Sequence, residues 1–227
     1  MDGLRFMLCP SPCQAPLPSG RALLLALAVV FVLDLALDGL VAAATQWLDS
    51  RMAFLPAPIE EETTLAEDLF GYLLLAPVLE ELLYRGWLTG RRAALRFAAY
   101  GFAAEALFVG GLFVPADKAG ALGLAGVAVA LAGLVHWSLT RDRDMMVPAW
   151  FIRHFRWLVW GSTLLFGLMH LGNYEALAHP LGVLVVLPQT LGGLLLAYTR
   201  TRLGLGAAMV HHAACNAVFL AGDYGWW

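Results

Sequence analysis

The sequence predicts an all-α protein that crosses a membrane about seven times. Hydrophobic residues make up 60% of its 227 residues and charged residues only 14%, against about 25% in soluble domains. A soluble domain of this length would lack the polar surface needed to cover so apolar an interior. The apolar residues also gather in runs close to the roughly 20 residues that a transmembrane helix needs. A polytopic helical bundle is therefore expected, and soluble globular and disordered classes are excluded.

Net charge and cysteine count argue against nucleic-acid-binding and disulfide-rich classes. A net charge of -3 offers no basic surface for DNA or RNA, and three cysteines do not make a disulfide framework. Residues 1–20 contain four prolines and no long apolar run, which is typical of a flexible N-terminal tail. Residues 21–227 are then expected to form a single transmembrane domain.

Hydropathy predicts seven spans. The first apolar run is too long for the core of a cleaved signal peptide. The second contains two glutamates and an arginine, so a strict hydropathy scan would discount it. The third and fourth are rich in Ala and Gly and meet at a short turn. No internal repeat is evident, which disfavours a transporter or channel. The predicted spans are residues 22–46, 67–89, 97–114, 119–139, 157–178, 181–199 and 204–222.

The basic residues indicate an orientation for these spans. With the N-terminus in the cytoplasm, eleven of the fourteen basic residues lie in cytoplasmic segments, as the positive-inside rule expects. A chain so rich in Arg and poor in Lys is typical of bacteria. We therefore expect an integral protein of the bacterial inner membrane with a cytoplasmic N-terminus. The eleven residues are Arg5, Arg21, Arg91, Arg92, Arg96, Arg141, Arg143, Arg153, Arg156, Arg200 and Arg202.

Glu80, Glu81 and Arg85 lie within the second predicted span. Ionisable side chains at bilayer depth are costly and by default mark a site. In an α-helix, Glu81 and Arg85 share a face and can form an ion pair, whereas Glu80 points about 100° away from Glu81. A Glu81–Arg85 pair can be purely structural, but it leaves the adjacent carboxylate of Glu80 without a structural role.

Two later spans carry polar side chains at a spacing of four residues. Phe166 and His170 share a face of the fifth span, and His212 and Asn216 share a face of the seventh. Taken alone, each can be an interhelix contact. The helical rise, however, places the polar groups of three spans at similar depths, roughly 12–20 Å from the cytoplasmic ends. A shared cavity explains this coincidence, and a carboxylate, two imidazoles and an amide suit hydrolysis by a base and oxyanion donors.

Together, the three motifs resemble those of the CPBP family of intramembrane proteases, which contains the type II CaaX-prenyl endopeptidases and bacterial relatives. The resemblance covers roughly residues 65–220. It implies an intramembrane endopeptidase with its catalytic cavity inside the membrane. The family patterns EExxxR, FxxxH and HxxxN stand here as Glu80-Glu81…Arg85, Phe166…His170 and His212…Asn216.

The resemblance also implies roles for these residues. Glu80 and His170 would hold and activate the attacking water, and His212 and Asn216 would form the oxyanion hole. Supporting roles would fall to Glu81, Arg85 and Phe166.

Metal dependence stays open at this point, because the family is described both as metal-dependent and as metal-free. Glu80, His170 and His212 match the two-His-one-carboxylate set of a catalytic zinc site. The chain has no HExxH motif, and Asn216 beside His212 fits an oxyanion donor better than a metal ligand. We therefore expect a glutamate protease without a cofactor, with a zinc-dependent version as the alternative.

Four further polar residues lie in predicted spans. Asp34 is expected to pair with a polar group of the bundle and Asp38 to reach the outer interface. Alternatively, both line the cavity or a proton path. His211 and Cys215 are expected to be structural, with a thiol nucleophile at Cys215 as the alternative.

The expected substrate is a hydrophobic or membrane-anchored peptide segment that enters from the bilayer or from the cytoplasmic side. The prenylated substrates of the eukaryotic relatives are not carried over to a bacterial chain, for which sorting tails or bacteriocin-type peptides fit. A non-catalytic membrane protein, such as a bacteriocin-immunity or scaffold protein, is the rival class. No nucleic-acid partner is expected.

Overall fold

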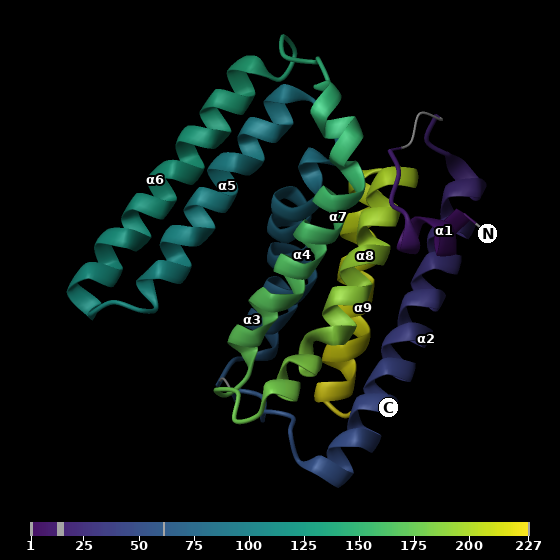
Figure 1. The fold of residues 1–227 in the computed structure, drawn as a ribbon, viewed down its shortest axis with the longest axis vertical. Coiled ribbons are helices and arrows are strands. Elements are labelled where there is room, and N and C mark those ends of the chain that lie inside the picture. Colours follow the sequence, from purple (N-terminus) through teal and green to yellow (C-terminus); the bar gives the residue numbers. More distant parts are fainter. Residues whose placement is uncertain (1, 13–15, 61, 227) are drawn as a thin grey trace. The chain divides into compact units, whose positions relative to one another are not determined.

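The computed structural model describes residues 2–12, 16–60 and 62–226. Within these ranges the chain is helical, and its only β pairing is an isolated bridge between Pro58 and Tyr174. Figure 1 shows the helices. They are α1 (Asp2–Leu8), α2 (Gly20–Met52), α3 (Leu65–Phe70), the π-helix η1 (Gly71–Leu75), α4 (Ala76–Glu80), the π-helix η2 (Glu81–Arg85), the 3-10 helix η3 (Gly86–Thr89), α5 (Arg92–Gly111), α6 (Ala116–Thr140), α7 (Ala149–Met169), the 3-10 helices η4 (His170–Asn173) and η5 (Pro180–Val186), α8 (Leu187–Arg202) and α9 (Leu205–Asp223).

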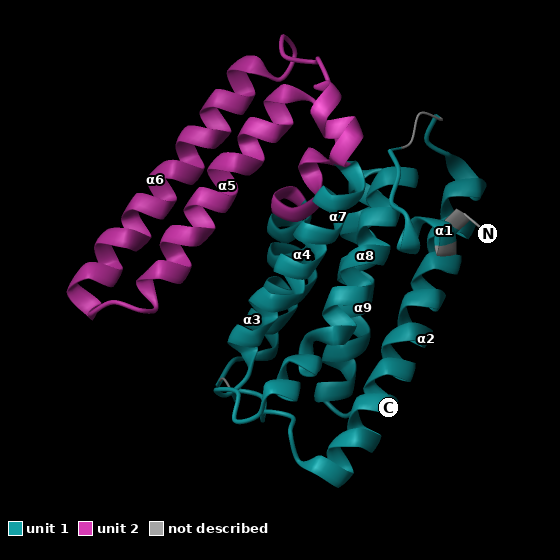
Figure 2. Ribbon diagram, in the orientation of Figure 1, with its two compact units in different colours: residues 1–81, 155–227 teal, residues 82–154 magenta. Residues whose placement is uncertain are grey.

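The chain divides into two compact units (Figure 2). The first unit, residues 1–81 and 155–227, contains the Glu80–Glu81 pair and all of the second and third motifs. The second unit, residues 82–154, is built around the α5–α6 hairpin. The prediction of a single transmembrane domain over residues 21–227 stays a prediction.

Five of the seven predicted spans correspond to helices that are long and apolar enough to cross a membrane. These are α2, α5, α6, the continuous η5–α8 segment and α9. The second predicted span is instead a succession of short α, π and 3-10 segments, and α7 falls below the same criterion of length and composition among the described residues. An all-α membrane bundle is confirmed, while the count of seven rests on these two weaker segments.

α2 presents the clearest lipid-facing surface. Leu24, Leu25, Val29 and Val32 are each more than half exposed, a pattern that would be costly in water and is favourable against lipid. Its 33 residues span roughly 50 Å at the rise of an α-helix, which exceeds the roughly 30 Å hydrocarbon core. α2 must therefore tilt or extend beyond the core.

The segment predicted to be a flexible tail begins with the short helix α1. Phe6 of α1 is 1% exposed, and its ring meets Tyr198 of α8 edge-on at 5.5 Å. The guanidinium of Arg202 lies 5.5 Å from the centre of the same ring. These contacts attach α1 to the cytoplasmic end that the sequence predicts for α8.

In the second unit, α5 and α6 pack closely because glycines of α6 face aromatic rings of α5. A Cβ on Gly133 would lie 2.5 Å from the Cβ of Tyr100, and a Cβ on Gly126 would lie 3.0 Å from the ring of Phe108. Small residues at such contacts let two membrane helices approach closely. This explains the Ala/Gly-rich composition of the third and fourth predicted spans.

In the first unit, α9 is the central helix. It packs against α2 and α8, and also against η1 and α4. Its buried residues include His211, His212 and Cys215. Because adjacent residues of an α-helix point about 100° apart, α9 can present one polar face to α2 and another to α4.

Gly167 allows α7 to approach α8 beside the second motif. A Cβ on Gly167 would lie 2.0 Å from Oγ1 of Thr190 and 3.2 Å from its Cα. We expect Gly167→Ala to lower the free energy of unfolding by about 1–3 kcal/mol, the usual cost of overpacking. Gly161→Ala, on the same helix but with nothing within 4 Å of the new Cβ, is the matched control. Equal thermal unfolding temperatures for the two variants in detergent would contradict this packing.

Candidate active site

The first motif lies on a helix interrupted by two π-helical turns. η1 ends directly before α4, and η2 begins at Glu81. The backbone N–H of Glu81 is shared between the carbonyls of Pro77 and Val78, which marks the change of pitch. Such turns are frequent at functional sites. The predicted Glu81–Arg85 pair spans the second of them, η2.

A cavity of about 600 Å³ lies within the first unit, in the size range of small-molecule and peptide sites. Side chains from α2, α4, α7, α8 and α9, together with η1 and η4, contribute to its wall. The cavity therefore brings together groups that are more than 180 residues apart in the chain. The polar residues at its wall include Asp34, Asp38, Glu80, His170, Gln189, His212 and Asn216.

His212 lies between the two carboxylates of the first motif. Its Nδ1 is 3.1 Å from Oε1 of Glu81, and its Nε2 is 3.8 Å from Oε2 of Glu80. Glu81 is fully buried, whereas the side chain of Glu80 is 30% exposed. Because a carboxylate accepts, Nδ1 of His212 donates to Glu81 and the second nitrogen faces Glu80. Glu81, predicted to have a supporting role, thus contacts His212 directly.

The second motif holds His170 at the C-terminal end of α7. Its Nδ1 donates to the carbonyl of Phe166 at 2.8 Å, which satisfies one of the carbonyls that a helix end leaves without a partner. The lone pair of the neutral imidazole is then on Nε2. The ring of Phe166 contacts both imidazoles, with centroid distances of 4.7 Å to His170 and 6.0 Å to His212.

Asn216 ties α9 to the first π turn. Its Nδ2 donates to the carbonyl of Tyr72 at 2.8 Å. In a π turn, a carbonyl accepts from the N–H of the residue five positions later. For Tyr72 that residue is Pro77, which has no N–H. Pro77 therefore cannot be that donor, and the amide of Asn216 donates to this carbonyl instead. Sequence analysis missed this role, although Pro77 within a predicted span was a signal for it.

A second contact joins α3 to Tyr224, the residue that follows α9. The hydroxyl of Tyr224 donates to Oδ2 of Asp68 at 2.9 Å. This hydrogen bond raises the pKa of Tyr224, because loss of the proton would leave two negative oxygens side by side. The helical segment that precedes the first motif is thus joined to α9 and to the residue after it by two hydrogen bonds.

The two aspartates of α2 differ from expectation in one respect. Asp34 pairs with a polar group of the bundle, as expected: its Oδ2 is 3.1 Å from Nε2 of His211. Asp38 is 7% exposed and lines the cavity, so the prediction that it reaches the outer interface is wrong. The alternative, in which both aspartates line the cavity, is the observed arrangement.

The structure brings Glu80, Glu81, His170, His212 and Asn216 to one cavity or its edge. Arg85 belongs to the second unit and is buried; its predicted pairing with Glu81 stays a prediction. Glu80, His170 and His212, the predicted zinc ligands, do not bring their ligand atoms within 4.8 Å of one another. Of the described residues, a single group of at least three His, Cys, Asp or Glu side chains has ligand atoms all within 4.8 Å of one another, and it consists of Asp34, His211 and Cys215.

The fold and the cavity define an α-helical integral membrane protein with a polar site enclosed by its helices. Residues 143–218 match the model of a protein family described as type II CAAX prenyl endopeptidase Rce1-like. The matched segment carries the second and third motifs, and the family resemblance predicted from the three motifs is confirmed. This match supports an intramembrane endopeptidase. Searches of curated proteins and of solved structures gave no significant match.

The hydrogen bond from Asn216 can be tested by removing its donor. Asn216→Asp keeps the shape of the side chain but cannot donate to the Tyr72 carbonyl. We expect the free energy of unfolding to fall by about 0.5–1.5 kcal/mol, the usual net contribution of one hydrogen bond. Asn173→Asp, which adds the same charge at an exposed cavity residue, is the control. Equal thermal unfolding temperatures for the two variants would show that the hydrogen bond between Asn216 and Tyr72 does not stabilise the fold.

Proposed function

We propose that this protein is a glutamate-dependent intramembrane endopeptidase in which Glu80 activates a water molecule. The observation that carries this proposal is the position of Oε2 of Glu80. This oxygen is buried without a hydrogen-bond partner among the described residues, at the wall of the cavity. Buried carboxylate oxygens are almost always partnered, by protein or by water. A water bound there would have a base within reach of its proton.

The proposed reaction balances with the residues present. Glu80 takes one proton from the water while the water oxygen bonds to the carbonyl carbon of the substrate. Nε2 of His170 accepts a hydrogen bond from the other O–H of the water and orients it. Glu80 then transfers its proton to the amide nitrogen as the C–N bond breaks. The products are an amine end and a carboxylic acid end, which keeps the second proton of the water until it ionises in solvent.

The oxyanion formed by this attack needs hydrogen-bond donors, and we assign them to His212 and Asn216. When His212 carries both protons, Nε2 donates while Nδ1 stays bonded to Glu81. Asn216 has two N–H groups, of which one donates to Tyr72 and the other would serve the oxyanion. Removing one such donor typically lowers turnover by about 10²–10³-fold.

A zinc-dependent version of the same protease is the second candidate. The donor types fit, because Nδ1 of each imidazole makes a hydrogen bond, and metal-binding histidines typically hold their second nitrogen in this way. The spacing does not fit: within the described part of the chain, Glu80, His170 and His212 do not form a group with mutual ligand distances below 4.8 Å. We therefore propose the metal-free mechanism and route no step through zinc.

The proposed substrate is a hydrophobic or membrane-anchored peptide. The cavity lies in a unit whose helices expose apolar side chains to lipid, so a substrate that partitions into the bilayer is concentrated at its entrance. The family description names a prenylated CAAX peptide, and lipid-anchored peptides in general share this chemistry.

The test is cleavage of matched peptides by the protein reconstituted in lipid vesicles. One peptide carries a C-terminal prenyl anchor, a second carries a transmembrane anchor, and a third has the same sequence without an anchor. We expect cleavage of at least one anchored peptide and little of the soluble one, with product masses identifying the bond. Equal cleavage of the soluble peptide would contradict the proposed substrate class. Binding of the anchored peptides without any cleavage would favour the rival non-catalytic class.

A further inference from the structure

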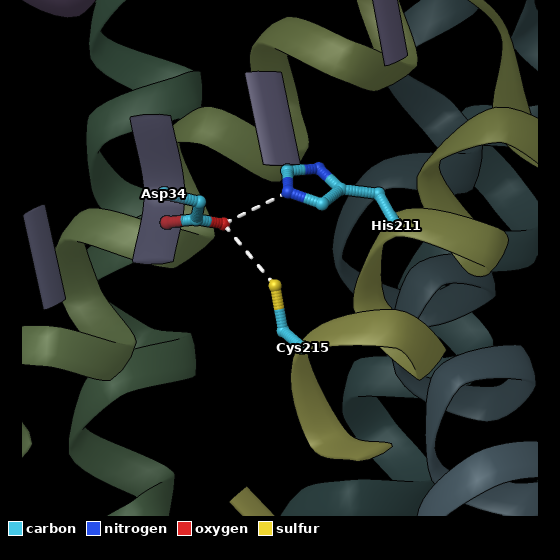
Figure 3. Close-up of side chains that lie close together, drawn as sticks. All are labelled: Asp34, His211 and Cys215. Atoms are coloured by element: carbon cyan, nitrogen blue, oxygen red, sulfur yellow. Dashed lines mark hydrogen bonds and ion pairs between the residues drawn. The ribbon is translucent and has the colours of Figure 1, made fainter. Parts of the chain in front are cut away.

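A second polar cluster lies on the face of α9 that is turned toward α2. Figure 3 shows the carboxylate of Asp34 on α2 facing both His211 and Cys215 of α9. Oδ2 of Asp34 is 3.1 Å from Nε2 of His211 and 3.7 Å from Sγ of Cys215. All three residues are buried, and their ligand atoms lie within 4.8 Å of one another. The catalytic proposal uses none of them.

The distances from Asp34 to the other two ligand atoms fit a tetrahedral metal site. With the usual zinc bond lengths, tetrahedral edges are roughly 3.3 Å between oxygen and nitrogen and roughly 3.6 Å between oxygen and sulfur. The observed separations of 3.1 Å and 3.7 Å are close to these values. His211 and Cys215 are four residues apart, so one face of α9 offers both ligands without a change of backbone.

The imidazole of His211 is already oriented as a metal ligand. Its Nδ1 is 3.1 Å from the hydroxyl of Thr199, which is fully buried on α8. The ring of Phe31 on α2 meets the His211 ring edge-on at 6.2 Å. Metal-binding histidines typically hold their second nitrogen in such a hydrogen bond, which fixes the tautomer and directs Nε2 at the ion.

Charge and burial also favour a cation in this cluster. Asp34 is 2% exposed, and its Oδ1 has no hydrogen-bond partner among the described residues. A carboxylate buried this deeply needs a compensating positive charge or further donors. A divalent ion bound to one carboxylate and one thiolate is a neutral unit, which suits a site inside the membrane.

We infer that Asp34, His211 and Cys215 bind a zinc ion that ties α2 to α9. Binding would displace the thiol proton of Cys215, since the thiolate is the metal ligand. Imidazole, thiolate and carboxylate together favour zinc over calcium or magnesium, which prefer oxygen ligands alone. Because Asp34 and Cys215 also line the cavity, the fourth ligand can be a water. The site is separate from Glu80, His170 and His212, so the inference does not depend on the proposed catalytic mechanism.

The test measures zinc bound to the full-length protein, purified in detergent, loaded with zinc and dialysed. Elemental mass spectrometry is expected to find about one zinc per chain, as for a structural site. Cys215→Ala and His211→Gln should remove it. Cys9→Ala and His154→Gln alter an exposed thiol and an exposed imidazole and should retain it, as should His170→Ala.

Cobalt substitution provides a second readout that does not need a variant of the site. With Cys9 and Cys13 replaced by Ala, Cys215 is the remaining cysteine of the chain. A thiolate-to-cobalt charge-transfer band in this protein would therefore identify Cys215 as a ligand. This measurement keeps the inference falsifiable even if variants of the site fail to fold.

Two outcomes would overturn the inference. The first is the absence of bound zinc after loading, together with no thiolate-to-cobalt band. The second is zinc that is lost in His170→Ala but retained in Cys215→Ala, which would place the metal at Glu80, His170 and His212. The second outcome would replace the metal-free mechanism by its zinc-dependent alternative, whereas loss in Cys215→Ala alone leaves the proposed catalytic mechanism intact.

Discussion

Replacing Glu80 by Gln is expected to lower the rate of peptide cleavage by about 10²–10⁴-fold, the contribution typical of a general base. Gln has nearly the same size as Glu and can still hydrogen-bond to water, but it cannot take a proton from it. The side chain of Glu80 is 30% exposed at the cavity wall, so the change should not disturb packing. The measurement is single-turnover cleavage of an anchored peptide, with thermal unfolding as a check of the fold.

Glu60→Gln is the matched control for this variant, because it makes the same chemical change at an exposed residue outside the helices. It should cleave at the wild-type rate. Turnover by Glu80→Gln close to that of the control would remove Glu80 as the base. If Glu80→Gln cleaves no peptide but still confers the immunity or scaffold activity of the wild type in cells, that result would instead support the non-catalytic rival.

Replacing Glu81 by Leu is expected to lower the free energy of unfolding by about 3–5 kcal/mol, the usual cost of removing one partner from a buried charged pair. Glu81 is fully buried and accepts a hydrogen bond from Nδ1 of His212 at 3.1 Å. Leu would leave that donor without its acceptor inside the membrane domain. Cleavage should be lost as well, since the orientation of His212 depends on this hydrogen bond.

Glu81→Gln separates folding from orientation. Its amide oxygen can still accept from His212, so most of the stability should return. Loss of the charge and a small shift of the imidazole should still lower cleavage by roughly 10²-fold, the typical cost of a misplaced catalytic group. Glu175→Leu, at an exposed residue, is the control for the thermal unfolding assay. Wild-type unfolding of Glu81→Leu would show that the Glu81–His212 contact does not contribute to stability.

The local pattern of the sequence predicted the class and much of the candidate site. Runs of apolar residues depend only on composition and length, so membrane helices can be predicted without tertiary information. Spacings of four residues likewise define a helix face wherever the helix is regular. This is why Phe166 near the end of α7 and His170 directly after that helix, as well as His212 and Asn216 on α9, are correctly placed at one cavity.

The same reasoning was weaker where the helix is not regular. The helix of the first motif contains two π turns around α4, which a pattern of regular helix faces does not predict. Sequence analysis assigned Glu81 a supporting role beside Arg85 but did not indicate its contact with an imidazole. The fold instead brings Glu81 to His212 and gives Asn216 a second role at the carbonyl of Tyr72.

The sequence by itself thus determined that this protein is a helical membrane protein with three polar motifs suited to hydrolysis. Only the tertiary structure decided which carboxylate contacts which imidazole, and that Asp34 meets His211 and Cys215. The physical reason is that helix periodicity is a local property of the chain. The pairing of helix faces depends on packing between α2, α4, α8 and α9, which no local pattern contains.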